Sequence, residues 1–500
     1  MGKVIYEELK PLFYPKSVAV VGATETAGKW GFNIFLNLIC GGFKGEIYPV
    51  NRRVDKVLGF KAYKSVKDIP VDVDLTSIVV PASQVPSVME DCVEKNVKAC
   101  VVISAGFGET GDEGKKFEDE VISIARRGGI RVVGPNCMGI FNTSINLNIL
   151  MPALLSDFSA FKGKISFVSQ SGNLGTNMVM WGFMRGVGFN KFVSSGNEAD
   201  LTCEDFIEYF GYDPETKVII AYIEGFKPNS RFPKLAKEIT RKKPIVILKT
   251  GATEAGAKAA RSHVGAMATK DEIVDALFKQ TGVIRVYDVE ELFDTAVALA
   301  NQPLPKGKRV GIVTGGGGWG VVCADTCAKL GLHVTPLSRE TVERINKLLP
   351  SYWSKSNPVD TVAVANPIAQ FRCVEEVIRD ENVDGVIYLG FGWAQNTLEK
   401  FKNSPYAGKL NLSILDKLVD AECEIARKLL SLIKETGKPV YVATLASNTP
   451  SINILESNGI LVYPTPERAA KVFAKTASYK LYLDKLKNVK DKEKLGSEAN

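Results

Sequence analysis

One local pattern recurs three times in the chain: a short apolar run rich in β-branched residues, a glycine-rich turn, and then a helical stretch. Residues 17–21 precede GATETAGKWG, residues 164–168 precede SQSGNLG, and residues 309–313 precede TGGGGWG. A short apolar run that leads through a turn into an amphipathic stretch is typical of a buried parallel strand followed by a helix. The pattern therefore predicts an α/β chain built on parallel sheets.

Further apolar runs extend this pattern and alternate with amphipathic stretches such as residues 113–127. These runs are residues 76–80, 99–103, 217–223, 244–248, 385–389 and 439–442. The polar, Asn-rich segment near 142–163 and the linker with Pro and Gly at 301–308 interrupt the alternation. A chain of 500 residues is expected to form about three domains. We predict domains at residues 1–148, 160–302 and 306–475, and a charged C-terminal tail at 476–500.

Composition and charge exclude several classes of protein. The 63 Lys and Arg residues against 56 Asp and Glu residues give a net charge of +7 without a basic run, which excludes a nucleic-acid tract and suits small anionic ligands. The longest charge-free stretches are rich in polar residues, so we expect no membrane span. The opening MGKVIYEELK lacks the apolar region of a signal peptide. Nine scattered cysteines without a CxxC motif predict reduced thiols, a cytoplasmic location and no metal site.

The first glycine-rich turn, residues 22–31, is a candidate anion site because its amides would face the positive end of a helix dipole. It differs from a nucleoside-triphosphate P-loop, since five residues separate its first two glycines and a tryptophan replaces the magnesium-binding Ser or Thr. It lacks GxGxxG, and the next strand ends in Asn51-Arg52-Arg53 instead of an acidic residue. These basic residues favour a phosphorylated ribose, as in NADP or coenzyme A. A structural turn without a ligand stays an alternative.

The second and third turns offer similar groups for an anion. The second supplies hydroxyl groups and amides from Ser169, Gln170, Ser171 and Gly172. The third has four consecutive glycines, Gly315, Gly316, Gly317 and Gly318. Such a run is expected where a ligand approaches the backbone closely or where the turn needs positive φ. Each turn alone is also compatible with a tight strand-to-helix connection.

The two histidines of the chain differ in their surroundings. His333 opens a short strand without reactive neighbours, and we predict a structural role for it. His263 lies in a segment composed mainly of Gly, Ala, Ser and Thr, residues 251–269, which is typical of a mobile loop. Lys258 and Arg261 beside it would favour a phosphoryl anion. An ordinary loop histidine is an equal alternative, because a single histidine is a weak signal.

Glu224 directly follows the apolar run 217–223. It therefore places a carboxylate at the carboxyl end of a strand, where the sites of α/β proteins assemble. Such a carboxylate could orient an imidazole through one ring nitrogen and leave the other nitrogen nucleophilic. A solvated acid at a strand end is the alternative.

With these motifs the chain resembles the NDP-forming acyl-CoA synthetase family, the superfamily of succinyl-CoA synthetase, and specifically the α subunit of archaeal ADP-forming acetyl-CoA synthetases. The resemblance implies a Rossmann-like CoA-binding domain followed by two flavodoxin-like, succinyl-CoA synthetase-like domains. Its motifs are VGATETAGKWG, IYPVNRR, VVPAS, SAGFGETG, GPNCMG, FVSQSGNLG, SSGNEAD, SHVGAMA, TGGGGWG, NPVD and YPTPERA.

By motif, the resemblance implies that His263 is phosphorylated during turnover and that Glu224 is its carboxylate partner. It further implies that the helices opened by the second and third turns hold the phosphoryl group at their N-termini. The residues that it implies in coenzyme A binding are Gly22, Thr24, Lys29, Gly31, Asn51, Arg52, Pro81, Ser104, Asn136 and Cys137. Departures from the family pattern, which bear on acyl specificity, are Asn173, Val264 and Met267.

The implied reaction converts acyl-CoA and phosphate to acyl phosphate and CoA, and then passes the phosphoryl group through His263 to ADP. No stretch is left for an ATP-grasp module, so the resemblance implies an ATP-grasp β subunit, an α2β2 assembly, and ADP or ATP with Mg²⁺ bound through that partner. The other substrate would be a small carboxylic acid. A non-catalytic CoA-binding regulatory protein of the same fold is the alternative, although His263 is present. An NADP-dependent oxidoreductase is disfavoured by the missing GxGxxG and the two additional glycine turns.

Overall fold

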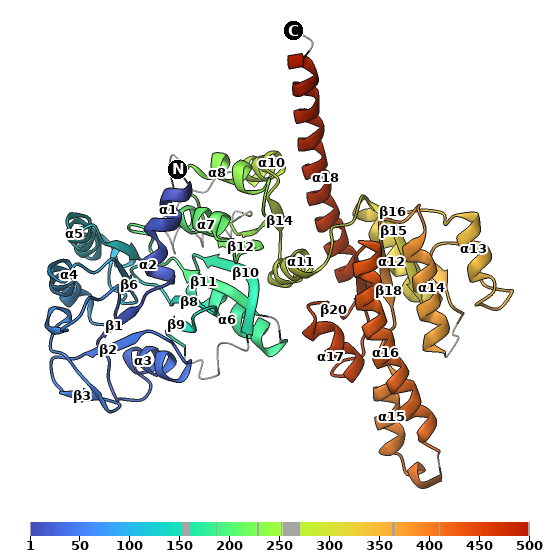
Figure 1. Cartoon of the computed structure of the whole chain (residues 1–500), viewed down its shortest axis with the longest axis horizontal. Helices are drawn as coiled ribbons and strands as arrows, with labels where there is room; N and C mark the ends of the chain where they lie inside the picture. The colour runs from blue at the N-terminus through green and yellow to red at the C-terminus, as the bar shows by residue number, and fades with distance from the viewer. Residues whose placement is uncertain are drawn as a thin grey trace. The chain divides into compact units, whose positions relative to one another are not determined.

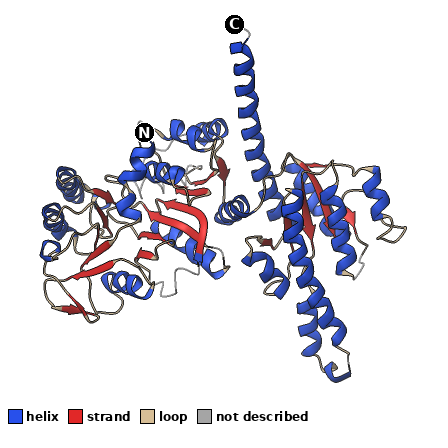
Figure 2. Ribbon diagram, viewed as in Figure 1, coloured by secondary structure: helices blue, strands red, loops and turns tan. Residues whose placement is uncertain are grey.

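The computed structural model shows an α/β chain that divides into two compact units, Met1–Leu292 and Phe293–Asn500. The first unit holds a five-stranded and a seven-stranded sheet, and the second holds a six-stranded sheet, all with helices beside them (Figure 1, Figure 2). The α/β class with parallel sheets that the sequence predicts is therefore confirmed. The structure describes residues 2–152, 161–186, 188–227, 230–251, 253, 271–362, 366–409 and 411–498. Within these ranges no helix is both long and apolar enough to cross a bilayer.

The first sheet is parallel and has the strand order β2-β1-β5-β6-β7. Its strands are β1 (Ser17–Val21), β2 (Glu46–Val50), β5 (Leu75–Ile78), β6 (Ala99–Val102) and β7 (Arg131–Val133). The helical segments between them are α3 (Trp30–Cys40), η1 (Val66–Asp68), η2 (Ala82–Gln84), α4 (Val85–Glu94), η3 (Gly108–Thr110) and α5 (Asp112–Arg127). A short hairpin of β3 (Lys56–Val57) and β4 (Phe60–Lys61) follows β2.

The second sheet has the order β14-β13-β12-β10-β11-β8-β9 and ends in two antiparallel strands. Its strands are β8 (Gly139–Asn142), β9 (Leu147–Leu150), β10 (Lys162–Ser169), β11 (Phe189–Ser194), β12 (Val218–Ile223), β13 (Ile245–Lys249) and β14 (Ile284–Val286). Its helices are α6 (Gly172–Met184), α7 (Cys203–Tyr212), α8 (Phe232–Ile239) and α10 (Asp271–Thr281). The predicted boundary at residue 148 falls inside the buried strand β9, and the Asn-rich segment begins at the end of β8, which is also buried.

The sheet of the second unit is parallel, with the order β16-β15-β18-β19-β20 and with β17 paired to β15. Its strands are β15 (Arg309–Thr314), β16 (His333–Val334), β17 (Val359–Asp360), β18 (Gly385–Leu389), β19 (Val440–Ala443) and β20 (Val462–Tyr463). Its helices include α12 (Gly317–Lys329), α13 (Arg339–Ile345), α14 (Pro367–Arg379), α17 (Pro450–Ser457) and α18 (Pro466–Glu498), while α11 (Val289–Asn301) spans the division between the units. The predicted start of the tail, residue 476, lies inside α18.

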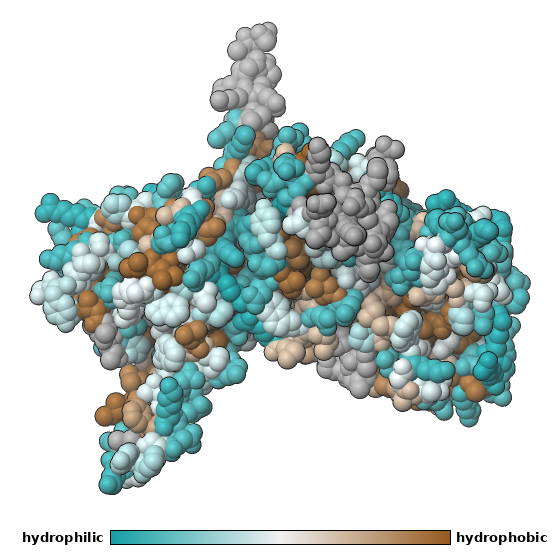
Figure 3. Space-filling view, turned by 180° about the vertical axis from the view of Figure 1, so that it is seen from behind, coloured by the Kyte–Doolittle hydropathy of each residue, from teal (hydrophilic) through white to brown (hydrophobic). Residues whose placement is uncertain are grey.

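A helical hairpin projects from the sheet of the second unit (Figure 1). It consists of α15 (Ala394–Lys402), η5 (Ala407–Lys409) and the first part of α16 (Ser413–Thr436). Apolar side chains are exposed along it (Figure 3), among them Phe401 and Ile414, which are 42% and 62% exposed. At its base, the buried Glu422 carboxylate accepts the Ala394 N–H at 3.1 Å from each oxygen. That bond fixes the start of α15 to α16.

Two N-terminal helices join the two sheets of the first unit. α1 (Gly2–Glu8) and α2 (Lys10–Phe13) precede the first sheet in sequence but pack against α7 of the second. Phe13 stacks on Tyr209 with 4.4 Å between ring centroids, and Tyr6 stacks on the same ring at 5.1 Å. These aromatic contacts belong to one hydrophobic core that continues through both sheets.

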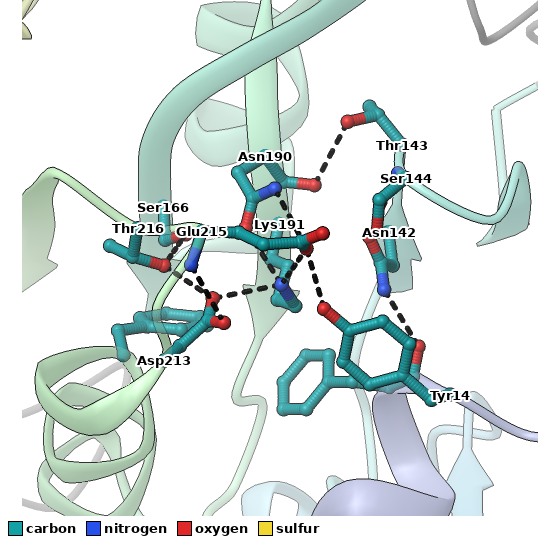
Figure 4. A network of polar contacts seen from close by, with 12 residues as sticks. Tyr14, Asn142, Thr143, Ser144, Ser166, Asn190, Lys191, Asp213, Glu215 and Thr216 are labelled. Carbon is teal, nitrogen blue, oxygen red and sulfur yellow. Dashed lines mark hydrogen bonds and ion pairs between the residues drawn. The ribbon is translucent and has the colours of Figure 1, made fainter.

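A buried network of charges lies at this junction (Figure 4). Lys191 on β11 is fully buried, and its Nζ lies 2.8 Å from an Asp213 carboxylate oxygen and 3.1 Å from Glu215. The Tyr14 hydroxyl donates to the same Glu215 carboxylate at 2.5 Å. Because a buried ammonium group is tolerated only with such partners, the network has a structural role.

Candidate functional site

A pocket of about 1200 Å³ opens at the carboxyl edge of the first sheet. The segments that follow β1, β2, β5 and β6 line it, which is the place where parallel α/β sheets bind ligands. Eight residues predicted to bind coenzyme A lie together in its wall: Gly22, Thr24, Lys29, Gly31, Asn51, Arg52, Pro81 and Ser104. The structure therefore brings these eight side chains and backbone segments to one cavity.

Two glycines allow the turn between β1 and α3 to lie close to the sheet. Gly22 has a φ of +93°, and a Cβ there would lie 2.3 Å from the Val79 carbonyl oxygen. A Cβ on Gly31 would lie 2.0 Å from the Gly22 carbonyl oxygen. Both positions exclude a larger residue, because the atoms in the way belong to the backbone. The start of α3 thus closes one end of the pocket.

The pocket wall is basic. Lys64 is paired with Asp55 at 2.7 Å, and the Arg52 guanidinium reaches the Ser87 hydroxyl at 3.5 Å. Within the described part of the chain, Lys29 and Arg53 form no ion pair, and both are exposed to solvent at the pocket. Two cations that form no ion pair with the described residues give this wall a positive potential that favours a phosphorylated ligand.

Asn136 and Cys137 lie beside this pocket and not in its wall. The Asn136 N–H donates to the Ser104 carbonyl at 2.9 Å, which ties its loop to a residue that lines the pocket. Cys137 is buried, and its thiol donates to the Val102 carbonyl at 3.4 Å. Burial raises the pKa of Cys137 to about 12, so this thiol is neutral near pH 7.

The second glycine-rich turn connects β10 to α6, and two of its polar side chains face inwards. Ser169 is fully buried, and its hydroxyl donates to the Ser171 carbonyl at 2.5 Å. The Gln170 amide is also buried and bonds to neighbouring backbone and side-chain groups. Ser171 and Gly172, at the start of α6, are partly exposed. The first amides of a helix have no acceptor within the helix, so this turn can receive an anion.

Glu224 lies at the same edge of the sheet as this turn. β10 and β12 are parallel neighbours with Ser169 opposite Tyr222, so Glu224 follows at the next level beyond the strand ends. Its side chain is 8% exposed, and its backbone N–H donates to Gln170 Oε1 at 2.6 Å. Burial raises the pKa of Tyr222, and the neighbouring Glu224 carboxylate raises it further.

The third glycine-rich turn, between β15 and α12, lies in the second unit. None of its four glycines has a positive φ. A Cβ on Gly316 or Gly318 would have no described atom of the chain within 4 Å outside its own helix and neighbours. Neither the backbone conformation nor packing against the described residues therefore requires glycine at these two positions. The observation excludes positive φ as the reason for this glycine run, while a Cβ on Gly317 would lie 2.9 Å from an Asp360 carboxylate oxygen.

The two histidines differ in what the structure describes. His263, with Lys258 and Arg261, lies outside the described residues. His333 is exposed and opens β16, opposite Arg309 at the amino end of β15. This position is the edge of the sheet away from the third glycine-rich turn, which follows the carboxyl end of β15.

Two residues of these sites were missed by the sequence reasoning, whereas Arg53, which belongs to the predicted basic strand end, lines the pocket beside Arg52. Glu198 is buried in the loop that follows β11, and its carboxylate accepts a hydrogen bond from Gln170. Lys249, at the end of β13, donates to the Glu224 carbonyl. Lys249 ends an apolar strand as Glu224 follows one, so the same signal could have found it. Glu198 has a φ of +56°, which nothing in its sequence indicates.

Comparison with known proteins gives a consistent family. A CoA binding domain matches residues 16–143, and a succinyl-CoA ligase like flavodoxin domain matches residues 162–299. Acetate–CoA ligase [ADP-forming] II subunit alpha of Pyrococcus furiosus is 40% identical over 464 residues, which cover 92% of this chain and 95% of the relative. The corresponding I subunit alpha is 38% identical over 480 residues, 94% of this chain and 97% of the relative.

A solved structure agrees with these relatives. The dinucleotide forming acetyl-coenzyme A synthetase 1 of Ca. Korarchaeum cryptofilum, in complex with phosphate and ADP, matches with a TM-score of 0.83 and 32% identity over 95% of this chain and 98% of that one. The relatives and the solved structure thus agree over nearly the whole length, and the two family domains cover much of the first 299 residues. The chain belongs to the NDP-forming acyl-CoA synthetase family, and within it to the α subunits of the ADP-forming acetate–CoA ligase type.

Proposed function

We propose that the pocket at the carboxyl edge of the first sheet binds coenzyme A. The pocket of about 1200 Å³ has the size for a nucleotide with a long extended arm, and Lys29 and Arg53 offer cations without ion-pair partners among the described residues. Ser104 and the adjacent Asn136 would lead the pantetheine arm towards the second sheet, because the Asn136 N–H bonds to the Ser104 carbonyl. Cys137, a neutral buried thiol, lines this path without taking part in the chemistry.

We infer that the second sheet and the third glycine-rich turn serve the phosphoryl relay. Phosphate attacks the thioester carbonyl of acyl-CoA, and CoA leaves as the thiol. The resulting acyl phosphate transfers its phosphoryl group to a ring nitrogen of His263, and the carboxylate leaves as the bond between phosphorus and the acyl oxygen breaks. The Glu224 carboxylate orients the imidazole through the other ring nitrogen. Amides at the starts of α6 and α12 would replace part of the hydration that the phosphoryl dianion loses. ADP then accepts the phosphoryl group, which regenerates neutral His263.

We propose that an ATP-grasp β subunit supplies the nucleotide site, in an α2β2 assembly. The Methanocaldococcus jannaschii acetate–CoA ligase [ADP-forming] is 44% identical over 360 residues, which make up only 50% of that protein. The Pyrococcus furiosus alpha subunits, in contrast, match from end to end. This difference in length supports the proposal that part of the longer relative corresponds to a second polypeptide here. Mg²⁺ held with ADP by that subunit would neutralise phosphate charge during transfer.

The other participants are a small carboxylic acid and its acyl-CoA, with acetate as the first compound to test. All nine cysteines are free, five of them in the first unit alone, which fits a reducing compartment such as the cytoplasm. The observation that carries the proposed function is the gathering of eight predicted coenzyme A residues in one basic pocket.

The test separates binding from synthesis. Isothermal titration calorimetry should show that the purified chain binds CoA without a partner. An assay with acetyl-CoA, phosphate, Mg²⁺ and ADP should yield no ATP until the β subunit is added. Failure to bind CoA would remove the first part of the proposal, and robust ATP synthesis by this chain alone would remove the second.

A further inference from the structure

The side chain of Gln170 holds the backbone that carries Glu224. Its Oε1 accepts the N–H of Glu224 at 2.6 Å and the N–H of Gly225 at 3.2 Å, while its Nε2 donates to the Gly225 carbonyl at 3.0 Å. Both N–H groups lie beyond the end of β12, where the sheet no longer supplies acceptors. Gln170 therefore continues the hydrogen bonding of the strand by one peptide with a single side chain.

Lys249 holds the backbone of Glu224 from the other side, at the carbonyl group. Its ammonium group donates to the Glu224 carbonyl at 2.8 Å and to the Thr250 carbonyl at 2.5 Å. The N–H and C=O of Glu224 are thus both fixed by side chains from neighbouring strands. Because the backbone of Glu224 is fixed, the direction of its Cα–Cβ bond is fixed as well, which limits the positions that its carboxylate can reach.

Glu198 determines which way the Gln170 amide faces. The Glu198 side chain is 3% exposed, and its Oε1 accepts Gln170 Nε2 at 3.2 Å, the Ser195 hydroxyl at 2.8 Å and the Cys203 N–H at 3.0 Å. A carboxylate can only accept, so the amide must present its NH₂ group to Glu198. The amide oxygen then faces the two N–H groups at 224 and 225. With the amide reversed, two oxygens would face each other in a buried site and both N–H groups would lose their acceptor.

We propose that Gln170 and Glu198 are positioning residues for the phosphoryl transfer, acting through the orientation of Glu224. Gln170 fixes the peptide that carries the carboxylate, and the acceptor oxygen of Glu198 fixes the orientation of Gln170. The inference rests on the proposed function of Glu224 as the partner of His263. In this role the Gln170 amide bonds to protein groups and does not contact the phosphoryl group directly.

The first test is Gln170→Glu, which keeps the size and the acceptor but removes the donors. Two carboxylates then face each other in a buried site, and the Gly225 carbonyl loses its donor. In the assembled enzyme with acetyl-CoA and labelled inorganic phosphate, without nucleotide, we expect the rate of His263 labelling to fall about tenfold or more. The Kd for CoA should stay within about twofold, because the pocket lies on the other sheet.

Exchanging the two groups provides the rescue. In the Gln170→Glu/Glu198→Gln double variant, an amide at 198 donates to a carboxylate at 170, whose oxygens still accept from the N–H groups of 224 and 225, while the Gly225 carbonyl stays without its donor. We expect labelling to recover part of the loss and to run about threefold or more faster than in Gln170→Glu. A double variant that labels as slowly as Gln170→Glu, or a single variant at the unmodified rate with normal thermal unfolding, would overturn the proposal.

A thermodynamic cycle separates positioning from general destabilisation. If Gln170 acts through Glu224, then Gln170→Glu should slow labelling little further in an enzyme that already carries Glu224→Gln. Full additivity of the two losses would contradict the proposal. Gln302→Glu is the matched control, because Gln302 is also buried and accepts a backbone N–H, that of Val440 at 3.0 Å, at the amino end of β19. It should lower the unfolding temperature without changing the labelling rate.

The outcome is independent of the test of the proposed function. If the unmodified enzyme gains no label on His263, the relay itself is wrong. If it gains label and Gln170→Glu does so equally fast, the relay stands and the positioning role is wrong.

Discussion

Two glycine-rich turns of this chain have the same place in their sheets but need glycine for different reasons. In the turn at residues 22–31, Gly22 requires a positive φ, and a Cβ on Gly22 or Gly31 would meet backbone within 2.3 Å. In the turn at 315–318, none of the glycines has a positive φ, and Gly316 and Gly318 have open space where a Cβ would be. The first turn uses glycine to pack, and the second leaves room that the described residues do not fill.

The difference separates structural from functional glycines. A glycine that the protein's own atoms require can be explained without a ligand, so it carries little evidence for one. A glycine that neither φ nor packing requires lowers helix stability without an internal benefit, which points to a molecule outside the chain. Substitutions at the two turns should therefore have opposite effects on stability.

The largest effect is expected for Gly31→Ala. Its Cβ would lie 2.0 Å from the Gly22 carbonyl oxygen, so α3 must move away from the turn. We expect the free energy of unfolding to fall by about 3 kcal/mol and CoA binding to be lost, as measured by urea titration and calorimetry. Gly28→Ala is the control: Gly28 has a φ of +83°, and a Cβ there would have no described atom within 4 Å apart from its chain neighbours, so the change should cost only about 1 kcal/mol, the cost of the backbone conformation. Equal costs at both positions would show that close packing is not the reason for Gly31.

A smaller effect, and one of opposite sign on stability, is expected for Gly318→Ala. Gly318 is exposed in the first turn of α12, where alanine is the better helix former, so the free energy of unfolding should rise by up to about 1 kcal/mol. The added methyl group should displace the phosphoryl group and slow its transfer on the order of 10- to 100-fold. Rapid-quench measurement of phosphoryl transfer in the assembled enzyme would check this. An unchanged rate of phosphoryl transfer in Gly318→Ala would show that only solvent occupies the space beside Gly318.

The smallest effects are expected from the exposed cations of the pocket. Each solvent-exposed charge contributes about 0.2–1 kcal/mol, so Lys29→Ala and Arg53→Ala should each raise the Kd for CoA about two- to fivefold. The increase should shrink with added salt, because salt screens exposed charges. Lys329 is an exposed lysine of the second unit and is paired there with Asp325, so Lys329→Ala should leave the Kd for CoA unchanged. A salt-independent effect at Lys29 or Arg53 would indicate a contact other than charge.

Much of the fold could be predicted because strand ends are marked by glycine. The runs at residues 17–21 and 385–389 coincide with β1 and β18. β8 and β9 could not be found in this way, because their asparagines are typical of a linker. In the structure these asparagines are buried and bonded: Asn142 Nδ2, for example, donates to the Phe13 carbonyl at 2.9 Å. That partner is over a hundred residues away, so local sequence does not reveal it.

The candidate site was predictable in part for a similar reason. Residues that follow parallel strands lie at the carboxyl edge of their sheet, as Ser104 does in the first sheet and Glu224 in the second. The direction of Gln170 could not be predicted, because it depends on Glu198, a residue of a different loop with positive φ. Sequence position thus indicates which residues gather at an edge, and tertiary hydrogen bonds decide which of them face the ligand.

The most direct test of the relay is the chemistry of the label on this chain. Incubated with acetyl-CoA and labelled phosphate, or with ATP and the β subunit, the chain should acquire a phosphoryl group that is labile in acid and stable in base, as expected for phosphohistidine. His263→Ala should abolish the label while CoA still binds, and His333→Ala should retain it, because His333 is an exposed residue at the far edge of its sheet. Label that persists in His263→Ala, or that depends on His333, would contradict the account.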